Sequence, residues 1–275
     1  MDISTYASFI EDNGSELEKA RFRRLFFGAK PEPTVVRNLT GLQNDDGGFP
    51  CRMTRGNPSS INDTLRALNW LDELGMLASP EAKSALDYLL AVQKDDGGWD
   101  EVPAATQYGT PPWASPGQLR ARMYLTAQCA YWLVVSGRVN HPAFRKSLGF
   151  LLRHREETGR FRGFLHTTWI ATGVLAMAGE EYSGVVEQGL HALMAKPVAE
   201  WVDSQISWAL EYLSRAGVSE DAPFVRLGLA QLLHRYEVNG RWESEDGEAY
   251  TVGATIGALK VLKSYGLLGG REAPR

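Results

Sequence analysis

Three titratable side chains stand where chemistry is expected, at the starts of apolar helical segments. Asp63, Asp203 and His166 each lie beside hydroxyl or amide residues there. A carboxylic acid that an apolar pocket keeps protonated can donate its proton to an alkene or an epoxide, and a histidine can assist or take up the final proton. We therefore predict Asp63 or Asp203 as a proton donor and His166 as a helper or terminal base.

The same residues also have structural interpretations, which the sequence leaves open. Ser60 and Asp63 are typical N-cap and first-turn residues, and such residues stabilise a helix by about 0.5–2 kcal/mol without any chemistry. Asp203 lies near Trp201 in a segment that is typical of a packed interior. An interior histidine such as His166 is more often a hydrogen-bonded structural group than an acid or a base.

Aromatic and amide side chains near these helix starts are the candidate binding residues. Aromatic faces stabilise carbocations through cation–π attraction. Aromatics at helical spacing are also typical of a packed core, so both interpretations stand. The predicted binding set is Trp113, Tyr124, Gln128, Trp169, Trp201, Gln205 and Tyr250.

Repeated helices must position these side chains. Five apolar segments end on a glycine, which takes a left-handed conformation after a helix without a Cβ penalty. The segments expected on the inside are about 61–75, 119–137, 165–178, 202–216 and 249–266. Those expected on the outside are 33–43, 81–93, 141–155, 182–195 and 221–236. The segments 4–10 and 15–27 form a sixth pair.

A short phrase of sequence occurs twice between these helices. Residues 42–49 read LQNDDGGF and residues 92–99 read VQKDDGGW. Aromatic residues at comparable places, Phe161, Trp201 and Trp242, are weaker copies and indicate a unit of about 40 to 50 residues. The long insertion at 100–118 contains Trp113 and is expected to cover something.

An apolar helix followed by this glutamine, Asp-Gly-Gly and aromatic phrase resembles the prenyltransferase/squalene-cyclase repeat. The resemblance implies an all-α fold, a single α/α toroid of five to six helical hairpins over residues 1–275. It implies that the glutamine and the aromatic tie each outer helix to its neighbour. It also implies an elongated apolar, isoprenoid-like substrate in a central funnel, cyclised or rearranged by protonation-initiated carbocation chemistry of an isomerase or lyase.

The sequence departs from both catalytic patterns of that family. The cyclases carry an Asp-x-Asp-Asp acid motif, which is absent here. The zinc-dependent prenyltransferases pair an aspartate with a cysteine, but Ala127 stands where that aspartate would precede Cys129. The acids at Asp95, Asp96 and 100–101 are interpreted as turn formers rather than cation ligands. We therefore predict no metal and no cofactor, and the proton donor stays open.

Two functions of other classes remain as alternatives. The chain could be a non-catalytic toroid that binds a lipid or a protein, in which case a funnel plugged by side chains is expected. It could be a carbohydrate-active enzyme, in which case two facing carboxylates about 5–10 Å apart are expected. A funnel with apolar walls and one buried acid would favour the cyclase instead.

Composition limits the class of protein. The 275 residues are 44% hydrophobic, which suits a large core, and the formal net charge of −4 argues against a nucleic-acid groove. The N-terminus lacks the features of a signal peptide, and no apolar stretch is long enough to span a membrane, so we expect a cytoplasmic protein. The basic run Arg21–Arg24 is interpreted as a solvated helix face, with peripheral membrane contact as the minor alternative. The oligomeric state is left open.

Overall fold

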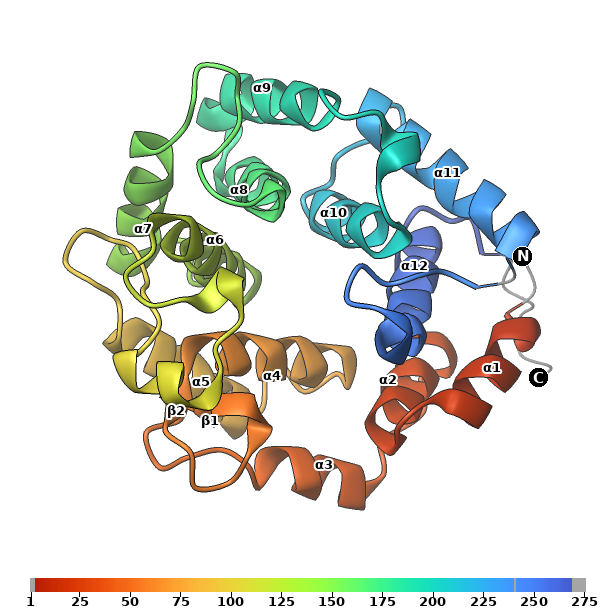
Figure 1. Cartoon of the computed structure of the whole chain (residues 1–275), viewed down its shortest axis with the longest axis horizontal. Helices are drawn as coiled ribbons and strands as arrows, with labels where there is room; N and C mark the ends of the chain where they lie inside the picture. The colour runs from red at the N-terminus through yellow and green to blue at the C-terminus, as the bar shows by residue number, and fades with distance from the viewer. Residues whose placement is uncertain (1–2, 240, 269–275) are drawn as a thin grey trace.

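The helices form two concentric rings, as the all-α toroid prediction requires (Figure 1). The computed structural model describes residues 3–239 and 241–268. The inner helices are α2 (Glu16–Phe27), α4 (Ile61–Glu73), α6 (Leu119–Val135), α8 (Leu165–Ala178), α10 (Asp203–Arg215) and α12 (Thr251–Ser264). The outer helices are α1 (Ser4–Asn13), α3 (Pro33–Thr40), α5 (Pro80–Ala91), α7 (Pro142–Arg153), α9 (Ser183–Leu193) and α11 (Pro223–Asn239).

The inner ring closes on itself. Each inner helix contacts the next one in the chain, and α12 contacts α2, so the first and last inner helices lie side by side. The expected assignment of inner and outer segments is confirmed, and the N-terminal segments supply the sixth pair. No described helix is long and apolar enough to cross a membrane.

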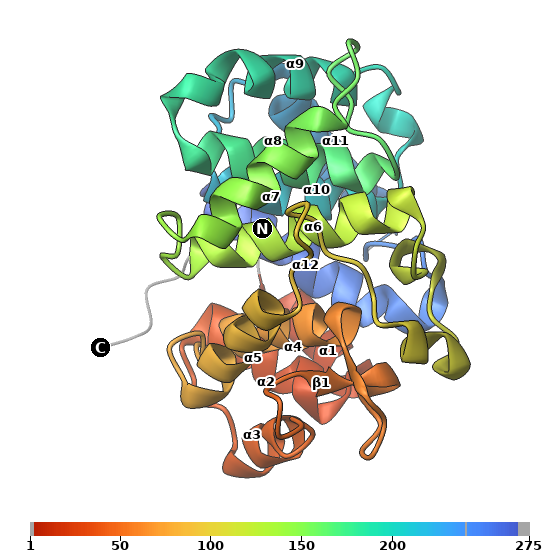
Figure 2. The same cartoon turned by 90° about the vertical axis from the view of Figure 1, so that its left-hand side faces the viewer.

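Short elements fill the loops. A two-stranded antiparallel pairing joins β1 (Phe49–Pro50) to β2 (Ser59–Ser60) ahead of α4. The insertion at 100–118 contains two 3₁₀ turns, η2 (Pro103–Tyr108) and η3 (Pro112–Ala114). Figure 2 shows this insertion at one end of the ring, on the side where α6 begins. The remaining 3₁₀ turns are η1 (Cys51–Met53), η4 (Glu180–Tyr182), η5 (Val198–Glu200) and η6 (Glu248–Tyr250).

The repeated glutamine ties neighbouring outer helices together. The Gln43 side-chain amide donates to the carbonyl of Gly47 at 2.8 Å and to the carbonyl of Glu81, in α5, at 2.9 Å. Gln93 repeats both contacts one unit later, and its second acceptor is Ala143 in α7. The bracing role that the resemblance implied for this residue is confirmed.

The first glycine of each Asp-Gly-Gly turn is required by space as well as by conformation. Gly47 and Gly97 have φ of +86° and +90°, a region that other residues rarely adopt. A Cβ on Gly97 would collide with the carbonyl oxygen of Lys146 in α7, and one on Gly47 would lie 2.5 Å from the carbonyl oxygen of Ser84. The turns therefore press directly against the next outer helix.

In three of the units the aromatic is anchored to an inner helix. The backbone N–H of Phe49 donates to the Thr64 hydroxyl at 2.8 Å, and that of Trp99 donates to the Thr126 hydroxyl at 2.9 Å. A third copy of this contact joins Phe161 to Thr168 at 3.2 Å. The Trp99 indole N–H also donates to the Leu89 carbonyl, and Trp242 makes the same bond ten residues upstream, to Leu232. These contacts fix the loops from which the inner helices start.

Candidate active site

A cavity of about 690 Å³ occupies the centre of the inner ring, a volume typical of small-molecule sites. Its walls come from α2, α4, α6, α10 and α12, and from the start of α8. Residues from the loops before α6, α8 and α12 complete the lining. The cavity is open, so it lacks the plug of side chains expected of a non-catalytic toroid.

Aromatic rings make up much of the cavity wall. The lining includes Trp70, Trp113, Tyr124, Trp132, Phe164, Trp208, Tyr212 and Tyr250. The Trp208 ring lies 5.4 Å from the His166 ring and 6.5 Å from the Tyr124 ring, centroid to centroid. Such a wall binds apolar ligands and can stabilise a positive charge over its ring faces.

A histidine and a carboxylate meet in the lining near the starts of α8 and α12. His166 Nε2 lies 2.8 Å from Glu245 Oε1, and the Gln205 amide donates to the other Glu245 oxygen at 2.7 Å. Burial, the largest single influence, raises the pKa of Glu245, but the hydrogen bonds from His166 and Gln205 and the charges of His166 and Lys196 together hold that pKa below its usual value. Glu245 is therefore an anion with both oxygens bound.

The neighbouring acid, Asp246, is shifted the other way. Partial burial raises the pKa of Asp246, and the negative charge of Glu245 raises it further, against the opposing effects of His166 and Arg66. Among the described residues, no hydrogen bond occupies its carboxyl group. Two adjacent acids whose pKa values are pushed apart are the usual arrangement for dividing the roles of proton donor and anion.

A buried ion-pair network lies at the C-terminal ends of the inner helices. Glu73 Oε2 accepts from Arg21 at 2.5 Å, its other oxygen accepts from Lys260 at 3.0 Å, and Lys260 also reaches Glu211 at 2.5 Å. Burial by itself raises the pKa of Glu73, but the charges of Arg21 and Lys260 and their hydrogen bonds together have the larger effect and lower that pKa. Glu73 is thus an anion and does not fit the role of proton donor.

Arg21 corrects one expectation from the sequence. The basic run Arg21–Arg24 was interpreted as a solvated face, but Arg21 is 8% exposed and lines the cavity beside Glu73. Phe22 is fully buried. Arg21 lies on the side of α2 that faces the cavity, and the Glu73 carboxylate of α4 compensates its charge there.

Half of the predicted site residues line the cavity. His166, Trp113, Tyr124, Gln128 and Tyr250 belong to the lining, and the Trp113 indole donates to the Asn62 side chain at 3.1 Å. The others, namely Asp63, Asp203, Trp169, Trp201 and Gln205, lie outside it. Gln205 still contacts the site, through Glu245.

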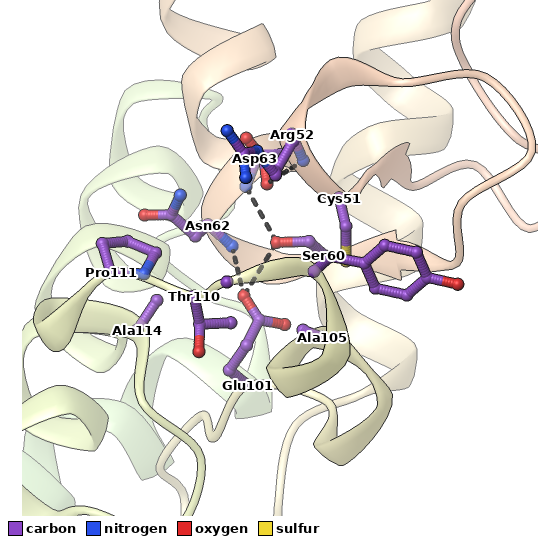
Figure 3. A pocket seen from close by; sticks show the side chains of 12 residues that line it. Cys51, Arg52, Ser60, Asn62, Asp63, Glu101, Ala105, Thr110, Pro111 and Ala114 are labelled. Carbon is purple, nitrogen blue, oxygen red and sulfur yellow. Dashed lines mark hydrogen bonds between the residues drawn. The ribbon is translucent and has the colours of Figure 1, made fainter.

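Asp63 is bound to backbone at the start of α4. One of its oxygens accepts from the Arg52 N–H at 3.0 Å, and the residue is 6% exposed. Figure 3 shows Ser60 between Asp63 and Glu101, and the Ser60 hydroxyl donates to the Glu101 carboxylate. That carboxylate also accepts from the Ile61 and Asn62 N–H groups and so caps the start of α4. The space between these groups is about 20 Å³, room for little more than one water molecule.

Asp203 has a similar setting at the start of α10. Its carboxylate accepts from Arg235 at 2.5 Å and from the Glu243 N–H at 2.8 Å, and the residue is almost fully buried. The Trp201 indole donates to the Lys196 carbonyl, and its ring packs 5.5 Å from that of Trp169. These groups hold the loops to the ring behind the cavity wall.

The acids of the second Asp-Asp-Gly-Gly turn bind protein groups. Asp96 accepts from the Gly98 N–H and pairs with Arg122, and Asp100 accepts from the Gly117 N–H. Across the described part of the chain, no three His, Cys, Asp or Glu side chains gather as a metal site would need. The turn-forming interpretation of these acids agrees with the hydrogen bonds.

Sequence reasoning missed Glu245, Asp246 and the ion-pair network. The first two lie in the loop that leads into α12, whereas Asp63 and Asp203 were chosen from the first turns of α4 and α10. The ion pair of Glu73 and Lys260 left no signal in the sequence. These residues are 187 positions apart, and only closure of the ring brings them together.

Comparison with known proteins agrees with this architecture. No protein-family model matches the sequence. The squalene–hopene cyclase of Zymomonas mobilis is 23% identical over 229 residues, which cover 74% of this chain and 35% of the cyclase. The chain therefore spans about a third of the length of the curated relative that it matches.

Solved structures share the fold at low identity. A protein from Actinoplanes gives a TM-score of 0.65 at 14% identity and covers 96% of this chain and 98% of its own. A type II terpene cyclase from Scytonema, in complex with its substrate geranylgeranyl dihydroxybenzoate, gives 0.59 at 15%, covering 92% and 88%. The ent-copalyl diphosphate synthase of Streptomyces platensis gives 0.60 at 16%, covering 91% and 50%. This chain has a terpene cyclase-like α/α toroid fold, and the predicted resemblance is confirmed at that level.

Proposed function

We propose that the chain binds an elongated isoprenoid in its central cavity and cyclises or rearranges it through a carbocation that Asp246 generates by protonation. The observation that carries the proposal is the pairing of an aromatic cavity with two adjacent acids of opposite pKa shift. The likeness to terpene cyclases supports the isoprenoid class of ligand.

Asp246 fits the role of donor better than Asp63 or Asp203. It borders the cavity, its carboxyl group is free of hydrogen bonds among the described residues, and its pKa is raised. The carboxylates of Asp63 and Asp203 lie outside the cavity lining and accept hydrogen bonds from backbone N–H groups. We assign those two residues to holding the loops.

The remaining roles follow from the geometry. Trp208 and Tyr124 offer their rings to the migrating positive charge. In its neutral form with the proton on Nε2, His166 donates to Glu245 and has a lone pair on Nδ1 that can accept the terminal proton. Water reaches Asp246 at the exposed edge of the cavity and can restore its proton after each turnover.

The charge of the cavity favours an uncharged substrate. The lining carboxyl groups are Glu18, Glu73, Glu211, Glu245 and Asp246, and the lining guanidinium groups are Arg21 and Arg66. Even with Lys260 beside Glu73 and Glu211, the acids outnumber the described cations. A diphosphate would be repelled, whereas a developing carbocation would be stabilised.

The carbohydrate alternative has less support. It needs two carboxyl groups free to act on opposite sides of a bond. Of the acids in the cavity, Glu73 and Glu211 are engaged by Lys260, and Glu245 is engaged by His166 and Gln205. Glu18 accepts from the backbone N–H and the hydroxyl of Ser15. That leaves Asp246 without a free partner of the kind such chemistry uses.

The test is incubation with linear prenyl alcohols, epoxides and diphosphates of C15 to C30, followed by mass spectrometry of the products. We expect cyclised or rearranged products from an uncharged member of this panel, together with a rise in melting temperature on binding. Absence of both turnover and stabilisation across the panel would reject the proposal.

A further inference from the structure

A chain of hydrogen bonds crosses the cavity wall and ends on one hydroxyl group. The Trp208 indole N–H donates to the Tyr212 hydroxyl at 3.3 Å, and that hydroxyl donates to Gln128 Oε1 at 2.8 Å. The Gln128 amide then donates to the Tyr124 hydroxyl at 3.1 Å. The four residues are defined here as the relay, and all of them line the cavity.

The direction of the relay follows from its first member. An indole N–H can only donate, so the Tyr212 oxygen accepts a hydrogen bond there and donates its own hydrogen to Gln128. The Gln128 carbonyl is thereby used, and its NH₂ group turns to Tyr124. Each bond polarises the next, which makes the last hydroxyl a stronger donor than an isolated one.

The hydrogen of the Tyr124 hydroxyl has no acceptor among the described residues. Tyr124 is 7% exposed and lines the cavity, so a ligand bound there can lie next to this hydrogen. Burial raises the pKa of Tyr124, so the hydroxyl keeps its hydrogen and, having accepted from Gln128, can donate at the end of the relay. Its ring packs beside those of Phe164, His166 and Trp208, in the aromatic part of the wall.

We propose that Tyr124 is an oxygen-recognition subsite: the isoprenoid bound in the cavity carries an uncharged acceptor oxygen, as in an epoxide, alcohol or carbonyl, that takes the free hydrogen bond of Tyr124. The inference rests on the proposed function for the isoprenoid class and adds the polar group that the site selects. A pure hydrocarbon would leave the buried donor unpaired, and sites built around such a donor discriminate against ligands that lack the acceptor.

Paired ligands test the subsite by affinity, without requiring turnover. The probes are linear isoprenoid alkenes of C15, C20 and C30 and the terminal epoxide of each, with dissociation constants measured by quenching of tryptophan fluorescence. The protein as it stands is expected to bind one epoxide about tenfold more tightly than its parent alkene, the contribution of one good hydrogen bond.

Two variants of the relay separate recognition from packing. Tyr124→Phe keeps the ring and removes the donor, so the preference for the epoxide should disappear while affinity for the alkene is kept. Gln128→Glu keeps the shape, but its carboxylate can only accept, so Tyr124 turns its hydrogen away from the ligand and the preference falls again. Tyr131→Phe, on the same helix but outside the cavity lining, is the matched control and should leave the preference unchanged.

The outcomes distinguish the subsite from the proposed function. Equal affinity for alkene and epoxide, or a preference that survives Tyr124→Phe, overturns the subsite and leaves isoprenoid binding intact. Failure of the unaltered protein to bind any probe overturns both. Melting curves of each variant show whether it has folded, and Tyr124→Phe carries the test if Gln128→Glu does not fold.

Discussion

His166 Nε2 lies 2.8 Å from Glu245 Oε1, although the two residues are 79 positions apart in the sequence. The contact joins the start of α8 to the loop before α12 across the mouth of the cavity. It holds Glu245 as an anion, and that anion is adjacent to Asp246 in the chain. The state of Asp246 therefore depends on a pairing that closure of the toroid creates.

Replacement of Asp246 by asparagine tests the proposed donor. Asp246→Asn should lower product formation by about 10²- to 10⁴-fold, because asparagine cannot supply the proton. Isoprenoid affinity and melting temperature should stay close to those of the unaltered protein, since the residue is exposed and its carboxyl group is not part of the packing. Product analysis and thermal unfolding give the two readings. Asp45→Asn, at another exposed acid, is the control, and turnover retained in Asp246→Asn would remove this residue from the mechanism.

The pH profile should follow the protonated form of Asp246. Turnover is expected below the pKa of Asp246 and should be lost as pH rises through it. Glu245→Gln removes the negative charge that helps to raise this pKa, so the loss should move to lower pH. Profiles of kcat against pH for the two proteins give the measurement. A limb at the same pH in both would mean that Glu245 does not control the donor.

The acids outside the cavity should matter for stability. Asp63→Asn and Asp203→Asn should each lower the free energy of unfolding by about 1–3 kcal/mol, because each weakens charge-assisted bonds to buried backbone. Urea unfolding provides the value. Product formation per folded molecule should change little. Unchanged stability with abolished turnover would instead make that residue the proton donor.

The ion-pair network should stabilise the protein in a pH-dependent way. Glu73→Gln leaves Arg21 and Lys260 short of a buried counter-charge and should cost about 3–5 kcal/mol in unfolding free energy. The pKa of Glu73 is lowered in the folded state, so its contribution is present above the unfolded pKa and is lost as pH falls through the folded one. Denaturant unfolding at neutral and acidic pH tests both parts. Asp87→Asn breaks an exposed pair with Arg138 and should cost no more than about 1 kcal/mol.

Alanine substitutions at two glycines distinguish the cost of a steric clash from the cost of backbone strain. Gly97 and Gly117 have φ of +90° and +74°, so alanine is strained at both. A Cβ at Gly97 meets Lys146, whereas one at Gly117 meets nothing within 4 Å. Gly97→Ala should therefore destabilise the protein clearly more than Gly117→Ala, by about 1–3 kcal/mol, as in overpacked sites. Equal melting temperatures would show that the turn does not press on α7 in solution.

The glutamine and glycine turns carried most of the fold information in the sequence. Gln43 and Gln93 mark the repeat, and the glycine stops mark the helix ends, because these contacts are local and recur in each unit. The inner and outer helices followed from the apolar pattern. His166 was predicted as a residue at the start of an inner helix and Tyr124 as an aromatic of an inner segment, and both line the cavity.

The sequence by itself thus determined the helices and their pairing, since period and turn chemistry are properties of neighbouring residues, and its resemblance to the repeat family implied the closed ring. Only the tertiary structure decided which acid faces the cavity. Near the start of a helix, a shift of a few residues decides whether a carboxyl group lines the cavity or binds backbone N–H groups of a loop. The tertiary structure turned Asp63 and Asp203 toward the loops and set Asp246 beside Glu245 at the cavity. It also joined Arg21, Glu73 and Lys260, whose charges meet only when the first and last inner helices close the ring.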